Sequence, residues 1–169
     1  LEHYRELDIE YKKKQNKRLG LFVTSCVISA VAFILAGVSD YLYRDNLTSN
    51  YDIYLQNAGT EVEKEDMLKQ YQKAIDLMPE RGDAYDRILS DVILDDDVLT
   101  QEEAYTIRDI LNANTQSGRP YEEYFMQNTA DYEKFAYKLG VAYFYSYEDK
   151  GNKSLSRKWL DIAAEAENL

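Results

Sequence analysis

The longest apolar stretch of the chain runs from Leu19 to Val38 and contains no charged residue. At about 1.5 Å of rise per residue, a helix of this length extends over roughly 30 Å, the thickness of the hydrocarbon core of a bilayer. The pattern therefore predicts a transmembrane helix over 19–38. The alternatives are a buried core helix of a soluble domain and a cleaved signal peptide, although their apolar segments are usually shorter.

The two flanks of this stretch differ in charge. Five basic residues precede it, namely Lys12, Lys13, Lys14, Lys17 and Arg18, whereas Asp40, Arg44 and Asp45 follow it with Tyr41 and Tyr43. Since an excess of Lys and Arg marks the cytoplasmic side of a span, we expect a single-pass protein of the cell membrane with its N-terminus inside. We expect residues 1–18 to form a cytoplasmic juxtamembrane helix, 39–50 a linker and 51–169 an extracellular domain. Because the chain begins with Leu1 rather than Met, we also expect it to be either shortened or the C-terminal part of a larger protein.

Beyond the apolar stretch, apolar residues recur at spacings of three and four, which is the pattern of amphipathic helices. One stripe comprises Met67, Leu68, Tyr71, Ala74 and Ile75, and a second comprises Tyr85, Ile88, Leu89 and Val92. Pro79 ends the first stripe, and Thr100 with Glu103 has the spacing of a capping box at the start of a further helix. No long alternating strand pattern appears, so we expect an all-α domain with about six or seven helices.

Two of these segments share their spacing with a known repeat. The residues Ala136, Leu139, Gly140 and Tyr143 stand as A-x2-L-G-x2-Y, and Met67-x3-Tyr71-x2-Ala74-x4-Pro79 follows the second half of the same pattern. This spacing resembles the tetratricopeptide repeat, a helix–turn–helix unit of about 34 residues. The resemblance implies an array of about three helical hairpins over 51–169, since one repeat cannot bury its apolar face alone. A generic helical bundle is the alternative, and residues 121–130 form an insertion that the repeat does not explain.

Tetratricopeptide arrays bind peptides in a groove lined by the first helix of each repeat. The resemblance implies seven groove residues in this chain: Asp52, Gln56, Asp86, Ser90, Tyr137, Val141 and Phe144. Arrays that bind a C-terminal carboxylate use Lys and Asn in the groove, and only Lys134 is available here. The resemblance therefore favours a protein or peptide ligand that is cationic or aromatic. The alternative for Val141 and Phe144 is a place in the core.

The charge of the expected outer domain agrees with such a partner. Residues 39–169 contain 27 Asp and Glu against 14 Lys and Arg, a net charge of −13. A domain of this charge repels nucleic acid and anionic headgroups, so we expect neither DNA nor RNA among its partners. Cys26 lies inside the apolar stretch, which leaves the outer domain without a disulfide and favours a bacterial cell surface over an animal secreted protein.

The outer domain lacks the residues of most catalytic and metal sites. It has neither His nor Cys, which removes the usual nucleophile–base pairs and most zinc sites, so we expect no enzyme, no cofactor and no metal in this chain. Residues 95–97 are three consecutive aspartates, but they do not match a calcium-binding EF-hand loop and are expected to form a solvated acidic turn. The tyrosine-rich segment 143–147 is expected to serve packing, with sugar stacking as the alternative.

Small residues form a stripe within the apolar stretch. Ser25, Ser29, Ala32 and Ala36 fall on one helical face, which allows close approach of a second helix. A homodimer through the span is one interpretation of this stripe, and simple tolerance of Ser and Ala in the span is the alternative. The N-terminal segment LEHYRELDIEYKKKQNKRLGLF resembles the linker between the cytoplasmic kinase domain and the span of bacterial receptor serine/threonine kinases. Our leading hypothesis is therefore the anchor and extracellular sensor or interaction domain of such a receptor. The alternative is a bitopic structural subunit of a bacterial secretion or cell-wall assembly.

Overall fold

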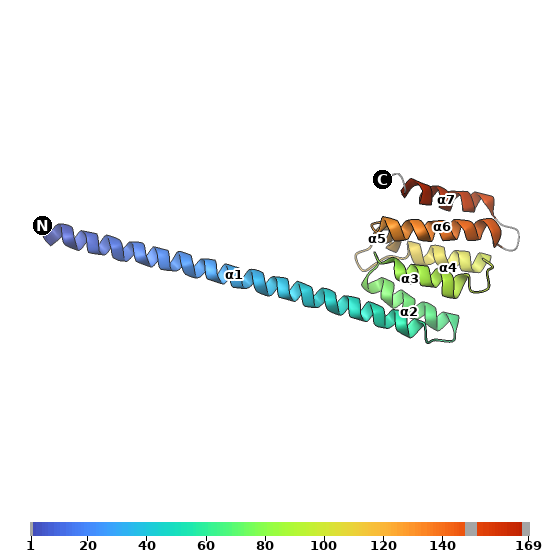
Figure 1. Ribbon diagram of the computed structural model, residues 1–169, viewed down its shortest axis with the longest axis horizontal. Helices are drawn as coiled ribbons and strands as arrows, with labels where there is room; N and C mark the ends of the chain where they lie inside the picture. The colour runs from blue at the N-terminus through green and yellow to red at the C-terminus, as the bar shows by residue number, and fades with distance from the viewer. Residues whose placement is uncertain (1, 148–151, 167–169) are drawn as a thin grey trace. The chain divides into compact units, whose positions relative to one another are not determined.

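The structure, a computed structural model, describes residues 2–147 and 152–166. Every element of the described residues is helical (Figure 1): α1 (Glu2–Ala58), α2 (Lys64–Leu77), α3 (Gly82–Arg87), the π-helical η1 (Ile88–Ile93), α4 (Gln101–Asn112), α5 (Tyr121–Phe125), α6 (Thr129–Tyr145) and α7 (Lys153–Ala166). The expected all-α class is thereby confirmed. The chain divides into two compact units, Leu1–Asn46 and Leu47–Leu169, and α1 contributes residues to both.

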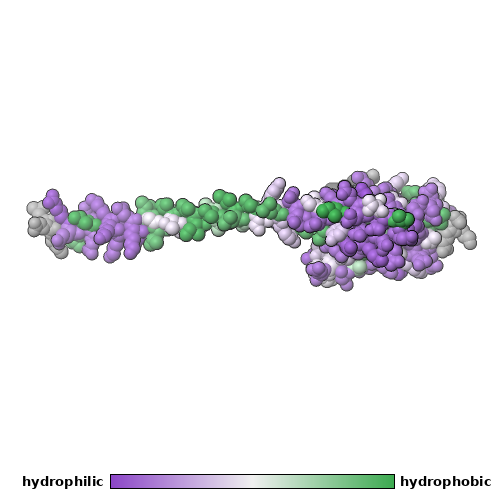
Figure 2. Space-filling model, turned by 90° about the horizontal axis from the view of Figure 1, so that it is seen from below, coloured by the Kyte–Doolittle hydropathy of each residue, from purple (hydrophilic) through white to green (hydrophobic). Residues whose placement is uncertain are grey.

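The apolar stretch 19–38 lies within α1 and is exposed along its whole length. Figure 2 shows it as a band of apolar side chains with polar side chains on its N-terminal side. Ion pairs lie on both flanks, since Lys12 Nζ is 2.8 Å from Asp8 Oδ2 and Arg44 Nε is 3.0 Å from Asp40 Oδ2. None of residues 19–38 is buried, and the helix is long and apolar enough by length and composition to be a membrane span or a signal sequence.

The helix does not end where the apolar stretch ends. Residues 39–50, which we expected to be a linker, are helical throughout, and α1 continues to Ala58. The segment contains neither glycine nor proline, so nothing in it interrupts the backbone hydrogen bonds of a helix. The last turns of α1 then carry Tyr51, Leu55 and Ala58, which are buried in the core of the second unit.

The helices of the second unit begin and end largely where the sequence pattern places them. Tyr71, Ala74 and Ile75 are the buried residues of α2, which ends two residues before Pro79. At the start of α4, Thr100 Oγ1 accepts a hydrogen bond from Glu103 N at 3.2 Å, and Glu103 Oε2 accepts one from Thr100 N at 3.0 Å. This reciprocal pair satisfies two backbone donors, so the predicted capping box is confirmed.

Aromatic side chains dominate the core of the second unit. Phe125 of α5 is fully buried, stacks on Tyr85 with 4.1 Å between ring centroids, and meets Phe135 edge to face at 5.5 Å. Tyr121, also on α5, is buried and donates a hydrogen bond to Asp76 of α2. The segment that stood out as an insertion in the sequence therefore supplies two of the core aromatic residues.

Glycine allows α7 to approach α6 closely. A Cβ atom added to Gly140 would lie 2.8 Å from Leu160 Cγ and 3.1 Å from Leu160 N, which is closer than ordinary van der Waals contact. A Cβ atom added to Gly82, the first residue of α3, would likewise collide with Asp131 near the start of α6. Both positions therefore require the absence of a side chain, as the repeat-like spacing implies for Gly140.

Candidate partner-binding site

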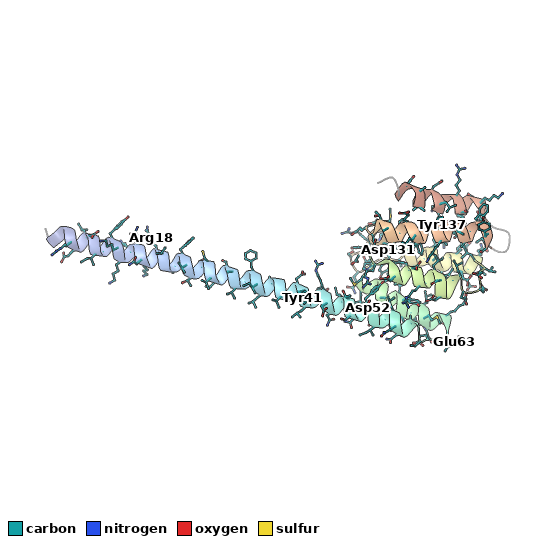
Figure 3. All side chains as sticks on the ribbon, viewed as in Figure 1. Arg18, Tyr41, Asp52, Glu63, Asp131 and Tyr137 are labelled. Atoms are coloured by element: carbon teal, nitrogen blue, oxygen red, sulfur yellow. The ribbon has the colours of Figure 1, made fainter. Side chains whose placement is uncertain are left out.

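A hollow of about 370 Å³ lies between η1 and α6, and we call it the partner hollow. Its lining comprises Leu89, Ser90, Leu94 and Asp97 from η1 and the following turn, and Tyr137, Lys138, Val141, Ala142 and Ser146 from α6 and its C-terminal end. Tyr137 is 59% exposed and projects from α6, where it is labelled in Figure 3. A large aromatic side chain thus stands at the rim of a concave surface that mixes apolar and polar groups.

The η1 wall of the partner hollow is a π-helical segment. Leu94 N donates a hydrogen bond to Leu89 O at 2.9 Å, which is the i→i−5 pairing of a π-helix. The buried residues Ile88, Val92 and Ile93 hold this segment on the core, while Ser90 stays exposed at the hollow. Such segments are rare and are often found at functional sites, so the wall is unusual in itself.

Among the described residues, the lining of the partner hollow has one acidic residue, Asp97, and one basic residue, Lys138. Lys138 forms an ion pair with Asp86 of α3. Asp91, next to Ser90, accepts hydrogen bonds from Ser90 Oγ at 2.8 Å and from Tyr71 Oη at 2.6 Å. Burial and the Asp91 carboxylate raise the pKa of Tyr71 to about 12, so its hydroxyl remains a donor at neutral pH.

A second hollow, of about 420 Å³, lies between α6 and α7. Its lining comprises Glu133, Lys134, Tyr137, Leu160, Ala163 and Ala164. Tyr137 lines both hollows, so its ring lies between two concave surfaces on the exposed side of α6. Exposed aromatic residues beside concave, mixed surfaces are typical of the residues that contribute most to protein–protein binding.

The structure brings together four of the seven residues that the sequence predicts for the groove. Ser90, Tyr137 and Val141 line the partner hollow, and Asp86 is bound to its Lys138. Phe144 is 42% exposed and packs edge to face on Tyr145, with 4.7 Å between the ring centroids, so it does not lie in the core. Val141 is half-buried, which also separates it from the core residues of α6.

The two remaining groove candidates, Asp52 and Gln56, lie on the last turns of α1. Both are exposed, and neither belongs to the lining of the partner hollow. Asp52 Oδ1 is 3.6 Å from Arg81 Nη1, and the Arg81 guanidinium lies 4.2 Å from the centroid of the Tyr51 ring. These contacts fix the end of α1 against the start of α3, which is a structural role for Asp52.

Sequence reasoning missed six residues of the partner hollow, namely Leu89, Leu94, Asp97, Lys138, Ala142 and Ser146. Lys138 follows Lys134 by four residues, so helical spacing was the signal that places both lysines on neighbouring parts of one face. Leu94 and Asp97 lie in the turn after η1, and their contribution depends on a π-helical register that an ordinary helical period does not predict.

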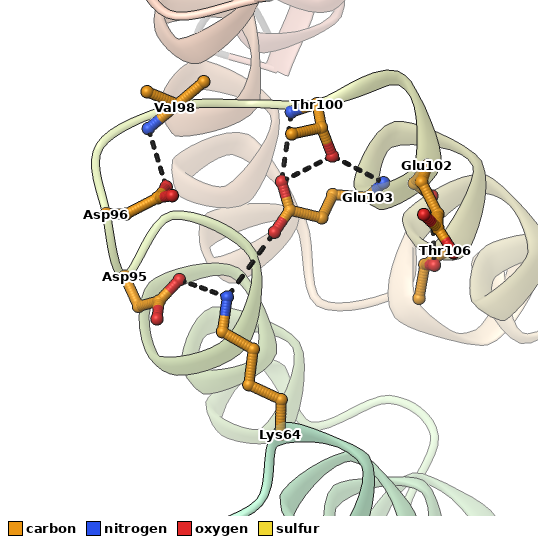
Figure 4. Close-up of polar contacts among 8 residues, drawn as sticks. All are labelled: Lys64, Asp95, Asp96, Val98, Thr100, Glu102, Glu103 and Thr106. Atoms are coloured by element: carbon orange, nitrogen blue, oxygen red, sulfur yellow. Dashed lines mark hydrogen bonds and ion pairs between the residues drawn. The ribbon is translucent and has the colours of Figure 1, made fainter.

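The acidic turn before α4, residues 95–97, is held by an ion pair with α2 and by a hydrogen bond close to the turn (Figure 4). Asp95 Oδ1 is 2.5 Å from Lys64 Nζ, which also lies 3.6 Å from Glu103 Oε1, and Asp96 Oδ1 accepts a hydrogen bond from Val98 N at 3.0 Å. The described residues contain no cluster of ligands that fits a metal ion. Asp95 and Asp96 therefore serve to position the helix start, whereas Asp97 lines the partner hollow.

No family model, curated protein or solved structure matches this chain. The resemblances to tetratricopeptide repeats and to receptor kinases therefore stay predictions from the sequence.

Proposed function

We propose that this chain is a membrane anchor with an extracellular helical domain that binds a protein partner. The observation that carries the proposal is Tyr137, an exposed aromatic residue that lines two hollows, whereas the other exposed aromatic residues of the domain, Tyr105, Phe144 and Tyr145, line neither. The exposed apolar helix supports the anchoring role, since water is a poor solvent for a helix with no covered face.

The expected partner presents basic or aromatic side chains. Glu133 and Lys134 both line the second hollow, whereas at the partner hollow Lys138 is already paired with Asp86, which leaves the carboxylates of Asp97 in the lining and of Asp91 next to Ser90. A basic segment therefore meets complementary charge there, which increases the association rate and disfavours acidic competitors. The tyrosine supplies a rigid apolar surface for an aromatic or aliphatic side chain of the partner.

We further propose that the chain is the C-terminal part of a bacterial transmembrane serine/threonine kinase. The support is the resemblance of its first 22 residues to a juxtamembrane linker, the basic inner flank and the single apolar helix. In this proposal, partner binding outside changes the association of two spans. The stripe of Ser25, Ser29, Ala32 and Ala36 provides a face on which two helices approach closely.

The binding proposal is tested by comparing capture of surface proteins by three full-length proteins in their own membrane. These are the wild type, a Tyr137→Ser/Val141→Ser double variant, and the control Tyr105→Ser. Tyr105 is an exposed tyrosine of α4 that lies outside both hollows. A partner that is cross-linked by the wild type and the control, and lost with the double variant, supports the proposal. Equal capture by all three proteins contradicts it.

The kinase proposal is tested by the reading frame upstream of Leu1. A Gly-rich loop, a strand lysine and an H-R-D motif in that order support it, because these residues hold ATP and the catalytic base of protein kinases. A different inner domain contradicts it and favours the bitopic subunit of a secretion or cell-wall assembly. In that case the partner hollow is expected to bind a neighbouring subunit of the assembly.

A further inference from the structure

A separate cavity of about 200 Å³ lies between α4, α6 and α7, and we call it the aromatic cavity. Its lining comprises Ala104, Tyr105, Ile107, Arg108, Leu139, Tyr143, Tyr147, Leu155, Lys158 and Trp159. None of these residues lines either hollow beside Tyr137. The cavity is therefore independent of the proposed partner site, and a ligand bound there leaves that site open.

Four aromatic rings and several aliphatic side chains give the cavity its apolar walls. The rings of Tyr143 and Tyr147 lie 5.4 Å apart between centroids, and Trp159 packs edge to face on Phe135 at 6.2 Å. Tyr105 is 47% exposed at the rim, whereas Tyr143 is buried. An apolar cavity of about 150 Å³ is large enough for benzene, so the aromatic cavity has room for one six-membered ring.

The ionic groups of the aromatic cavity have a sign opposite to that of the domain. Among the residues that the structure describes, Arg108 and Lys158 are the charged residues of the lining, and no described carboxylate belongs to it. The Arg108 guanidinium lies 4.6 Å from the Tyr105 ring centroid, and Lys158 Nζ lies 5.8 Å from that of Trp159. Arg108 also contacts Asp109 Oδ1 at 3.1 Å, but both side chains are exposed, so that pair is weak and exchangeable.

We propose that the aromatic cavity binds a small organic anion that consists of one ring and a carboxylate. The ring packs on the tyrosine and tryptophan side chains, and the carboxylate accepts charge-assisted hydrogen bonds from Arg108 and Lys158 at the rim. An aromatic acid and an acidic sugar share this chemistry, because the apolar face of a sugar ring also packs on aromatic side chains. Arg108 and Lys158 supply local positive charge at the rim that favours an anionic ligand there, whereas the net charge of −13 of residues 39–169 repels anions at long range.

The chain carries its own reporter for this proposal, since Trp159 is its single tryptophan and lines the cavity. The full chain is reconstituted in phosphatidylcholine vesicles, and its tryptophan emission is followed during titration with benzoate or glucuronate. Benzyl alcohol and methyl glucoside are the matched neutral compounds. We expect a saturable change with at least one of the two acids at up to about 10 mM. Saturation by benzoate alone assigns aromatic acids, and saturation by glucuronate alone assigns acidic sugars.

Charge variants separate binding in the cavity from general attraction to the protein. Arg108→Gln and Lys158→Gln are each expected to weaken binding of the acid about tenfold, because each removes a charge-assisted hydrogen bond. Arg157→Gln is the matched control, since Arg157 is exposed, lies 3.8 Å from Asp161 and does not line the cavity. Circular dichroism of each variant establishes that its helices are intact. The proposal is overturned by the absence of a saturable change, by equal binding of acid and neutral compound, or by equal loss in the control.

Discussion

Helix α1 carries two apolar segments that differ in what covers them. Between residues 19 and 38 no side chain is buried, whereas Tyr51, Leu55 and Ala58 on its last turns are buried in the core of the second unit. Both segments are helical, so helix formation does not distinguish them. Burial, rather than helix formation, therefore separates the exposed apolar stretch from the folded domain. An apolar residue of the second segment is covered by protein, and the anchoring proposal implies that one of the first is covered by lipid.

The largest expected effect is on membrane association, and it results from charged residues placed in the first segment, residues 19–38. Ile28→Arg combined with Val31→Arg introduces two charges near the centre of the apolar stretch, at a cost of roughly 5 to 7 kcal/mol for insertion into a bilayer. We therefore expect the double variant to leave the membrane fraction, as measured by extraction of cell membranes with alkaline carbonate. The matched control is Ile53→Arg with Val62→Arg, two exposed apolar residues of the second unit, which is expected to stay in the membrane fraction.

The same experiment distinguishes a span from a signal sequence. If the wild-type chain is released by carbonate and has lost its apolar segment, this segment is a cleaved signal sequence and the anchoring proposal is wrong. If the double-arginine variant remains as firmly inserted as the wild type, the exposed surface of residues 19–38 does not face lipid.

Truncation of a buried side chain on the second segment is expected to cost less, but still several kcal/mol. Tyr51 is fully buried, and its Oη accepts a hydrogen bond from Ala84 N at 3.0 Å. Tyr51→Ala leaves a cavity and an unpaired backbone donor, so we expect a loss of about 3 to 5 kcal/mol in the free energy of unfolding. Urea unfolding followed by circular dichroism at 222 nm measures this loss. Tyr41→Ala on the same helix, at an exposed tyrosine, is the control and is expected to leave unfolding unchanged.

Local patterns predicted the ends and faces of several helices because the causes are local. The Thr100–Glu103 capping box needs only residues three apart, and the buried face of α2 follows from helical spacing. The helical continuation over 39–50 was not predicted because the polar residues there resemble a linker, although the segment contains neither glycine nor proline. Phe125 was missed because its partner Tyr85 lies 40 positions away and no local signal connects them.

The partner hollow could be predicted in part. Ser90, Tyr137 and Val141 were implied by the resemblance to tetratricopeptide repeats, and the structure places all three in one lining. The ion pair of Lys138 with Asp86 joins residues 52 positions apart, so it depends on how α3 and α6 pack. The aromatic cavity depends in the same way on three helices that meet only in the folded domain.

Buried tyrosines are expected to make the second unit sensitive to alkali. Burial raises the pKa of Tyr51 to about 12, and burial with the Asp76 carboxylate does the same for Tyr121. Because the folded pKa is above the unfolded value of about 10, the stabilisation is complete below pH 10 and is lost as pH rises toward 12. The expected slope is up to about 1.4 kcal/mol per pH unit for each such tyrosine. Urea unfolding at several pH values measures the slope, and absorbance at 295 nm reports tyrosine ionisation.

Tyr51→Phe is the control for the alkaline transition. It retains the ring and removes the titrating hydroxyl, so we expect a slope that is smaller by the contribution of one proton. A slope that is unchanged in this variant, or stability that does not depend on pH between 10 and 12, contradicts the role of the buried hydroxyl.

The smallest expected effect on stability comes from a glycine of the second unit, Gly140, and we compare it with Gly37 of the apolar stretch. Gly140→Ala forces a methyl group against Leu160, where the backbone nitrogen as well as the side chain is close, so α6 and α7 have to separate. We expect a loss of about 1 to 3 kcal/mol in the free energy of unfolding, the usual range for overpacking in a core. Gly37→Ala is the matched change in the apolar part of α1, where a Cβ atom meets nothing within 4 Å. Since alanine is also the better helix former there, Gly37→Ala is expected to leave both membrane association and unfolding of the second unit unchanged. If Gly140→Ala and the wild type are equally stable in urea, α6 and α7 are not held together at this glycine. If Gly37→Ala loses membrane association, a partner helix packs against this side of the span.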